Sequence, residues 1–191
     1  MRLGVLDHGH PLHIKALFAV IRLMSGHPVV DAVKLAFYRR DFYGAGELTH
    51  EAMRGTSEWS VGDRELMAAV VSQANECPFC VAAHTATSRQ WYRDDAKVAA
   101  VLADSDAAPI GAALRETLRL LGKLAREHRV DADDIRAVLD AGASAEQIKD
   151  ALGVCLAFDI TNRLANAFNF EIAEPAAMDA GARHLLKRGY R

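Results

Sequence analysis

Apolar residues recur at intervals of three and four along nearly the whole chain, whereas the alternation of apolar and polar residues typical of strands is hard to find. This spacing places apolar side chains on one face of a helix, so we predict an all-α fold. Capping-box patterns at residues 60–63 and 144–147 mark two helix starts, and Pro78 suits the first position of another helix. The predicted helices span residues 11–24, 28–40, 60–74, 78–91, 94–103, 109–128, 131–141, 144–168 and 175–187, and residues 43–58 form a looser connection with at most a short helix.

Length and charge narrow the class of protein. No linker or low-complexity tract divides the 191 residues, which predicts a single helical domain over residues 1–191. A net charge of −2 gives no general attraction to nucleic acid or to an anionic membrane. No uninterrupted apolar run reaches the ~20 residues that span a bilayer, and the apolar stretch at residues 12–24 is interrupted by Arg22 and followed by no small-residue cleavage site. We therefore expect a soluble, cytoplasmic protein.

The candidate chemistry follows the helix predicted at residues 60–74. Cys77, Cys80 and His84 are separated by three and four residues, so on one helix their side chains share a face. Cys77 falls near the predicted N-cap, where unpaired N–H groups favour a thiolate and lower a thiol pKa from about 8.5 toward ~3.5–7.5. Two sulfurs at this spacing can also close a disulfide after local adjustment. The pattern therefore indicates a nucleophilic, redox-active pair.

Cysteine pairs of this spacing also occur in thioredoxin-like proteins and in zinc sites. A thioredoxin fold places the pair after a strand, and we predict no strand. A structural zinc site needs four ligands, whereas Cys77, Cys80 and His84 give three, with His50 or Glu76 as the fourth. In a third interpretation, the two cysteines are small buried apolar groups beside a hydrogen-bonded histidine.

Glu65 lies twelve residues before Cys77, early in a helix that is apolar on nearly all sides. In one interpretation it complements the positive N-terminus of that helix beside Asp63. In the other it is a carboxylate held in an apolar site, where burial raises its pKa and makes it usable as a proton donor and acceptor.

Other polar and sulfur-bearing residues give weaker indications of function. Cys155 lies in an apolar helix and is expected in the core. On the same helix a polar stripe forms either an exposed face, a subunit interface or the wall of an active cleft; its members are Asp159, Asn162, Arg163 and Asn166. The N-terminal histidines His8, His10 and His13 are expected to bind nothing specific. We find no nucleotide or metal motif and predict no cofactor.

The combination of Glu65, Cys77-Pro78-Phe79-Cys80 and His84 is far more specific than the cysteine pair alone. It resembles the Glu…Cys-x-x-Cys-x-x-x-His signature of the alkylhydroperoxidase D-like branch of the carboxymuconolactone decarboxylase family. The resemblance covers residues 38–168. The surrounding matches are Gly46-Glu47-Leu48-Thr49, Met53-Arg54-Gly55, Trp59-Ser60, Arg64-Glu65-Leu66, Ala141-Gly142-Ala143-Ser144 and Gln147-Ile148.

The resemblance implies an alkylhydroperoxidase D-like helical domain that assembles as trimers or hexamers and reduces organic hydroperoxides or hydrogen peroxide. It implies that Cys80 attacks the peroxide, that Cys77 resolves the product into a disulfide, and that Glu65 and His84 relay protons. A dithiol such as a lipoyl carrier would supply the electrons. The helix dipole alone instead favours Cys77 as the better thiolate.

The chain departs from the family pattern at one position. Family members often carry a second histidine immediately before the later cysteine, and this chain has Phe79 there. Two alternative functions remain: a lactone-processing enzyme of the decarboxylase branch, which generally lacks the cysteine pair, and a non-enzymatic redox switch that uses the same disulfide.

Overall fold

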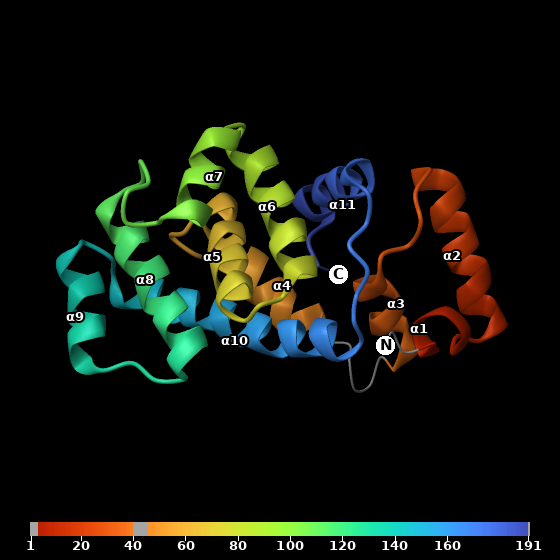
Figure 1. Cartoon of the computed structure of the whole chain (residues 1–191), viewed down its shortest axis with the longest axis horizontal. Coiled ribbons are helices and arrows are strands. Elements are labelled where there is room, and N and C mark those ends of the chain that lie inside the picture. Colours follow the sequence, from red (N-terminus) through yellow and green to blue (C-terminus); the bar gives the residue numbers. More distant parts are fainter. Residues whose placement is uncertain (1–3, 40–45, 191) are drawn as a thin grey trace.

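The computed structural model describes residues 4–39 and 46–190. Every regular element in these ranges is an α-helix, which confirms the all-α prediction (Figure 1). The helices are α1 (Val5–His8), α2 (Leu12–Ser25), α3 (Asp31–Tyr38), α4 (Gly46–Arg54), α5 (Val61–Ala74), α6 (Pro78–Tyr92), α7 (Asp95–Ala103), α8 (Ala112–Glu127), α9 (Ala132–Asp140), α10 (Ala145–Ala167) and α11 (Pro175–Arg188).

Most predicted boundaries lie within a few residues of these bounds. The short helix α1 was not predicted, and α3 begins at Asp31 rather than at Pro28. The predicted end of that helix at residue 40 and the first part of the predicted connection, residues 43–45, lie outside the described residues. The rest of the connection holds α4, the short helix that the prediction allowed.

Both predicted capping boxes form. The Ser60 hydroxyl accepts a hydrogen bond from the Asp63 N–H at 3.1 Å, and the Asp63 carboxylate accepts one from the Ser60 N–H at 3.1 Å. Ser144 and Gln147 make the same reciprocal pair at 3.0 and 2.9 Å. These bonds satisfy N–H groups that have no partner within the helix, so α5 and α10 begin where the sequence predicts.

Helix α5 lies at the centre of the fold, packed against α6, α8 and α10 (Figure 1). Its residues Leu66, Met67 and Val71 are fully buried, which explains why the sequence is apolar on nearly all sides of this helix. Leu121 of α8 and Phe158 of α10 complete the same core. Burying each such side chain stabilises the fold by roughly 1.5–3 kcal/mol. A polar group on α5 is therefore held in a dry and rigid setting.

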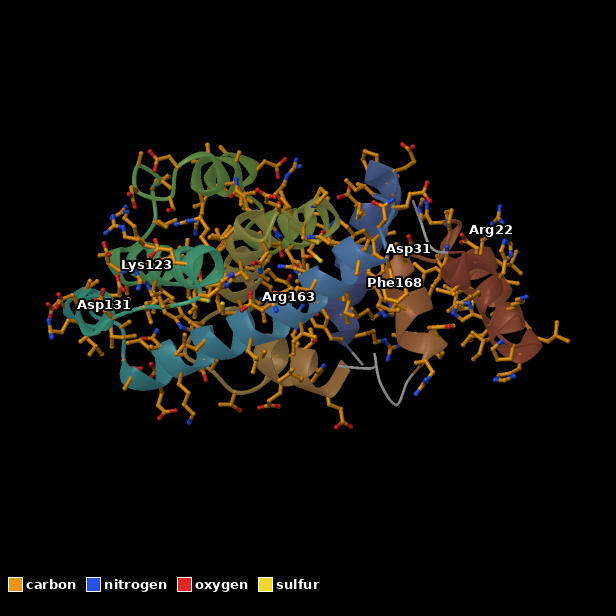
Figure 2. The ribbon with its side chains drawn as sticks, turned by 60° about the horizontal axis from the view of Figure 1, so that its bottom comes forward. Arg22, Asp31, Lys123, Asp131, Arg163 and Phe168 are labelled. Atoms are coloured by element: carbon orange, nitrogen blue, oxygen red, sulfur yellow. The ribbon has the colours of Figure 1, made fainter. Side chains whose placement is uncertain are left out.

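A second apolar cluster joins the N-terminal helices to the cysteine segment. It contains Leu6, Leu35, Cys77, Phe79, Cys80 and Phe168. At this junction, labelled by Asp31 and Phe168 in Figure 2, the Glu171 N–H donates to the Asp31 carboxylate at 2.8 Å. Helix α2 contributes no buried residue, and its Leu12 and Leu23 are 83% and 85% exposed. None of the helices within the described ranges is long and apolar enough to cross a membrane.

Candidate active site

The turn between α5 and α6 presents the first cysteine. Cys77 occupies the N-cap position of α6 and Pro78 the first helical position, as predicted. The Cys77 N–H donates to the Ser72 carbonyl at 2.9 Å. Glu76, immediately before Cys77, has a φ of 51°, in the left-handed region that few non-glycine residues adopt. The chain therefore reverses tightly at Glu76, and this reversal aims Cys77 at the start of the helix.

Polar side chains of α10 hold this turn in place. The Asn75 side-chain amide donates to Asp159 at 2.8 Å. The Asn166 amide donates to the carbonyls of Asn75 and Glu76 at 3.2 and 3.3 Å. Two residues of the predicted polar stripe therefore bind the backbone or side chains directly before Cys77.

Asn162, a third member of the stripe, is fully buried and its side-chain oxygen accepts from the Ser72 hydroxyl at 3.0 Å. The exposed-face interpretation of the stripe is therefore wrong for Asn162, because the residue faces α5 rather than solvent. Arg163 does lie on the outer side of α10 (Figure 2). Cys155 is 1% exposed and belongs to the main core, which confirms its expected place.

The two sulfurs of the pair are free thiols with different environments. Cys77 is 1% exposed and Cys80 2% exposed. The hydrogen bond from the Cys80 thiol, helped by the N–H groups of Cys80 and Phe79 and opposed by burial, lowers the pKa of Cys77 to about 7. The same hydrogen bond, together with burial, raises the pKa of Cys80. The pair thus holds one thiolate near neutral pH, on Cys77, as the helix-dipole argument favours.

Cys77 lies at the wall of a groove of about 920 Å³. Along α6 the groove is lined by residues one turn apart, including Val81 and Thr85. Ile172 and Met178 form part of the opposite wall. Of the two cysteines, Cys77 borders this groove and Cys80 does not.

Glu65 and His84 meet on the interior side of α6. The Glu65 carboxylate is fully buried, and one of its oxygens lies 2.7 Å from His84 Nδ1. The other oxygen accepts from the Arg54 guanidinium at 2.6 Å. The Tyr190 hydroxyl lies 2.9 and 3.1 Å from the two oxygens. Three helices, α4, α5 and α6, and the segment after α11 thus bring three hydrogen-bond donors to a single carboxylate. The Phe158 ring of α10 packs against the His84 ring at 4.4 Å.

The charge state of Glu65 differs from the expectation that burial raises its pKa. Burial does act in that direction, but the hydrogen bond and charge of His84 and the charge of Arg54 outweigh it, so the pKa of Glu65 lies below its ordinary value. Glu65 is therefore an ionised carboxylate. The ionised carboxylate accepts a hydrogen bond from the N–H of His84 Nδ1. This contact favours the tautomer of His84 in which Nε2 carries no proton and is free to act as a base.

The fourth zinc ligands considered from the sequence lie elsewhere. The ring of His50 accepts a hydrogen bond from the Tyr190 N–H at 3.3 Å, and Glu76 is exposed at the groove. Within residues 4–39 and 46–190, no three His, Cys, Asp or Glu side chains are grouped so that they could hold a metal ion.

Comparison with known proteins agrees with this geometry. The sequence profile of the carboxymuconolactone decarboxylase family matches residues 41–123, the segment that contains Arg54, Glu65, Cys77, Cys80 and His84. A peroxidase-related protein from Silicibacter sp. TM1040 is 26% identical, with a TM-score of 0.72 over 86% of each chain. Residues 41–123 thus resemble the carboxymuconolactone decarboxylase family.

Two further solved structures share the fold of this chain. One is described as an alkylhydroperoxidase AhpD core, an uncharacterized peroxidase-related protein from Ralstonia eutropha JMP134; it is 24% identical, with a TM-score of 0.73 over 92% of this chain and 93% of that one. The other is the debrominase Bmp8, 12% identical, with a TM-score of 0.65 over 90% and 91% of the two chains. No curated protein matches the sequence. The fold is thus alkylhydroperoxidase D-like, as predicted.

Sequence reasoning missed two residues of the Glu65 cluster. Arg54 stands in a matched segment of the family pattern, and a buried carboxylate needs a cationic partner, but the sequence holds 23 basic residues and does not say which one. Tyr190 lies outside residues 41–123, and no local pattern marks it. Only the tertiary fold brings it to Glu65.

Proposed function

We propose that this protein is a thiol-dependent peroxidase that reduces hydroperoxides through Cys77 and Cys80. The observation that carries the proposal is the placement of the pair between two different environments. On one side Cys77 adjoins an open groove. On the other, one helical turn beyond Cys80, His84 is held by the ionised Glu65. A nucleophilic pair, a base and an access route are what a thiol peroxidase requires.

In the proposed cycle, His84 Nε2 takes the proton of Cys80 when a peroxide enters. The raised pKa of Cys80 means that this sulfur needs a base, and His84 follows it by one helical turn. The Cys80 thiolate attacks the nearer peroxide oxygen, so that an S–O bond forms and the O–O bond breaks. Cys80 is oxidised by two electrons to a sulfenic acid, and the departing alkoxide takes the proton back from His84 and leaves as an alcohol.

Cys77 then resolves the intermediate. Its pKa of about 7 makes it a thiolate without help from a base. It attacks the Cys80 sulfenic sulfur, a disulfide forms, and the hydroxide takes up a proton and leaves as water. An external dithiol such as a lipoyl carrier attacks the Cys77 sulfur from the groove, is oxidised to its own disulfide, and returns both cysteines to thiols. We propose that the substrates are organic hydroperoxides or hydrogen peroxide and that the chain acts as a homo-oligomer.

Mass-spectrometric thiol trapping after one equivalent of cumene hydroperoxide tests the mechanism. We expect a Cys77–Cys80 disulfide in the parent, and a trapped sulfenic acid on Cys80 in the Cys77→Ser variant. Cys155→Ser is the matched control, because burial raises the pKa of Cys155 to about 12 and this buried thiol should not take part. If the parent forms no disulfide, the proposal fails. A sulfenic acid on Cys77 in the Cys80→Ser variant, together with none on Cys80 in the Cys77→Ser variant, would reverse the roles of the sulfurs.

Steady-state turnover separates the peroxidase from its rivals. A peroxidase consumes many equivalents of hydroperoxide when dihydrolipoamide is present in excess, whereas a redox switch consumes one. A lactone-processing enzyme would instead keep its activity on a lactone when both Cys77 and Cys80 are replaced by serine. Turnover that survives the Cys77→Ser and Cys80→Ser double variant would contradict the proposal.

A further inference from the structure

The segment after α11 is shaped to carry a side chain into the interior. Helix α11 ends at Arg188, and Gly189 follows with a φ of +72°. A Cβ at Gly189 would lie 2.7 Å from the His50 ring and 3.2 Å from the Arg54 side chain, so only glycine suits both the backbone and the space. The next N–H, that of Tyr190, donates to His50 Nδ1 at 3.3 Å. The backbone therefore turns inward at Gly189 and is held there.

The Tyr190 ring reaches the charged centre of the site. Its hydroxyl lies within hydrogen-bond distance of both Glu65 oxygens and 3.4 Å from His84 Nδ1. The Arg54 guanidinium lies over the ring at 5.1 Å from its centre, and the ring runs nearly parallel to that of His84, at an interplanar angle of 23°. Packing alone would require none of these polar contacts.

We propose that Tyr190 is a positioning residue of the cysteine site, whose hydroxyl donates to Glu65 and thereby holds the carboxylate against His84 Nδ1. This inference rests on the function proposed above. A carboxylate that already accepts from Arg54 and Tyr190 attracts a further proton on His84 less strongly. Removing the hydroxyl would therefore leave a more strongly attracting carboxylate beside His84, and the pH profile of the proposed reaction would report that change.

The charged and titratable groups around Glu65 and His84 come from several elements. Helix α4 supplies Arg54, α5 supplies Glu65 itself, and α6 supplies Cys80, whose charge acts on Tyr190. Helix α10 packs the uncharged Phe158 ring against His84. His50 contacts the Tyr190 backbone rather than its hydroxyl. Burial and the charge of Glu65 raise the pKa of Tyr190 well above its ordinary value, so the hydroxyl stays a donor throughout the working range.

The pH profile of peroxide turnover in Tyr190→Phe tests the role of the hydroxyl, because phenylalanine keeps the ring. Loss of one hydrogen bond to a charged acceptor changes its titration by about one pH unit. We expect the acid limb of kcat/KM to move up by about one unit, an approximately tenfold loss on that limb, with the plateau changed by less than about threefold. Tyr92→Phe is the matched control, since the Tyr92 hydroxyl also donates to a carboxylate, that of Asp63, away from the pair. An acid limb equal to the parent's would reduce Tyr190 to a packing role.

A second readout does not depend on peroxide. In a Cys77→Ser background, we expect the pH profile of Cys80 alkylation by iodoacetamide to shift when Tyr190→Phe is added, and to be unaffected by that change when Glu65→Gln is also present. If the parent turns over no peroxide but Tyr190→Phe still shifts the alkylation profile in the Cys77→Ser background, the proposed function is overturned and the Tyr190 inference is supported. No shift in alkylation would overturn the inference itself.

The parent protein also offers a test that needs no variant to fold. Nitrogen-15 shifts of His84 report which ring nitrogen carries the proton. We expect the neutral tautomer with the proton on Nδ1, toward Glu65 and Tyr190. A proton on Nε2 would overturn the inference, because the Tyr190 hydroxyl and the imidazole would then not share Glu65 as acceptor.

Discussion

Replacing Glu65 by glutamine should destabilise the protein far more than the loss of one charge at the surface. The substitution preserves the shape of the side chain but leaves the Arg54 guanidinium buried without its counter-charge, with 10% of that side chain exposed. It also turns an amide N–H toward Arg54 or His84, which both donate. Removing one partner of a buried ion pair costs about 3–5 kcal/mol. Since domains unfold at roughly 5–15 kcal/mol, this is a large part of the total.

The pH dependence of this cost follows from the lowered pKa of Glu65. A carboxyl whose pKa is lower in the folded than in the unfolded state adds stability above its unfolded value of ~4.3, and this stability is lost as pH falls through the folded-state pKa. Glutamine has no such contribution. The difference in unfolding free energy between parent and Glu65→Gln should therefore be constant from about pH 6 to 8 and shrink below about pH 4.

Urea denaturation followed by circular dichroism across this pH range measures the difference. Glu116→Gln is the matched control, because Glu116 pairs with the half-exposed Arg119 on the surface of α8 at 2.7 Å. Such a pair contributes about 0.2–1 kcal/mol. The reasoning that Glu65 is ionised and accepts three hydrogen bonds would be refuted if Glu65→Gln lowered the free energy of unfolding by less than about 1 kcal/mol at pH 7. It would also be refuted if this loss grew as the pH fell.

Three further changes test other parts of the structure. Cys80→Ala should raise the pKa of Cys77 above about 7, since the hydrogen bond from Cys80 lowers that pKa most. Alkylation of Cys77 by iodoacetamide at pH 7 should then slow, and an unchanged rate would show that another group stabilises the Cys77 thiolate. Phe79→His should cost about 2 kcal/mol in urea unfolding without raising turnover, because Phe79 packs edge-on against Phe170 at 5.1 Å. Ser144→Ala should cost about 1 kcal/mol by removing the α10 cap, and a cost near zero would show that the cap is redundant.

Local signals predicted the features that depend on neighbouring residues. Ser60 and Ser144 mark helix starts because their hydroxyls bond N–H groups three residues away, and Cys77 falls at an N-cap because Pro78 cannot lie inside a helix. Cys80 and His84 lie on α6 and Cys77 is its N-cap, so their spacing could be read directly from the sequence.

Features that depend on packing between distant segments were beyond such signals. The interpretation of Glu65 as a carboxylate in an apolar site gave its pKa shift the wrong direction, because Arg54, eleven residues away, was not known to reach it. Asn162 looked like part of an exposed stripe, yet it is buried against Ser72, ninety residues distant in sequence. A polar residue on an apolar helix is ambiguous until its partner is known.

The start of helix α6 lies between the groove, from which a reductant would approach, and the buried Glu65–His84 pair, which would transfer protons. Cys77, Val81 and Thr85 follow one another at helical spacing along the groove, whereas Cys80 and His84 lie on the buried side toward α5. A disulfide between Cys77 and Cys80 would therefore join the two sides of one helix start. In the proposed cycle an external thiol would approach Cys77 from the groove, while protons would pass between Cys80 and the Glu65–His84 pair on the buried side of the helix. In the proposed cycle a peroxide enters from the groove and passes Cys77 before it meets Cys80, so we expect small or slender hydroperoxides to be preferred over bulky ones. Comparing kcat/KM for hydrogen peroxide with that for cumene hydroperoxide measures this preference, and a clear preference for the bulkier substrate would place the attacking sulfur at Cys77.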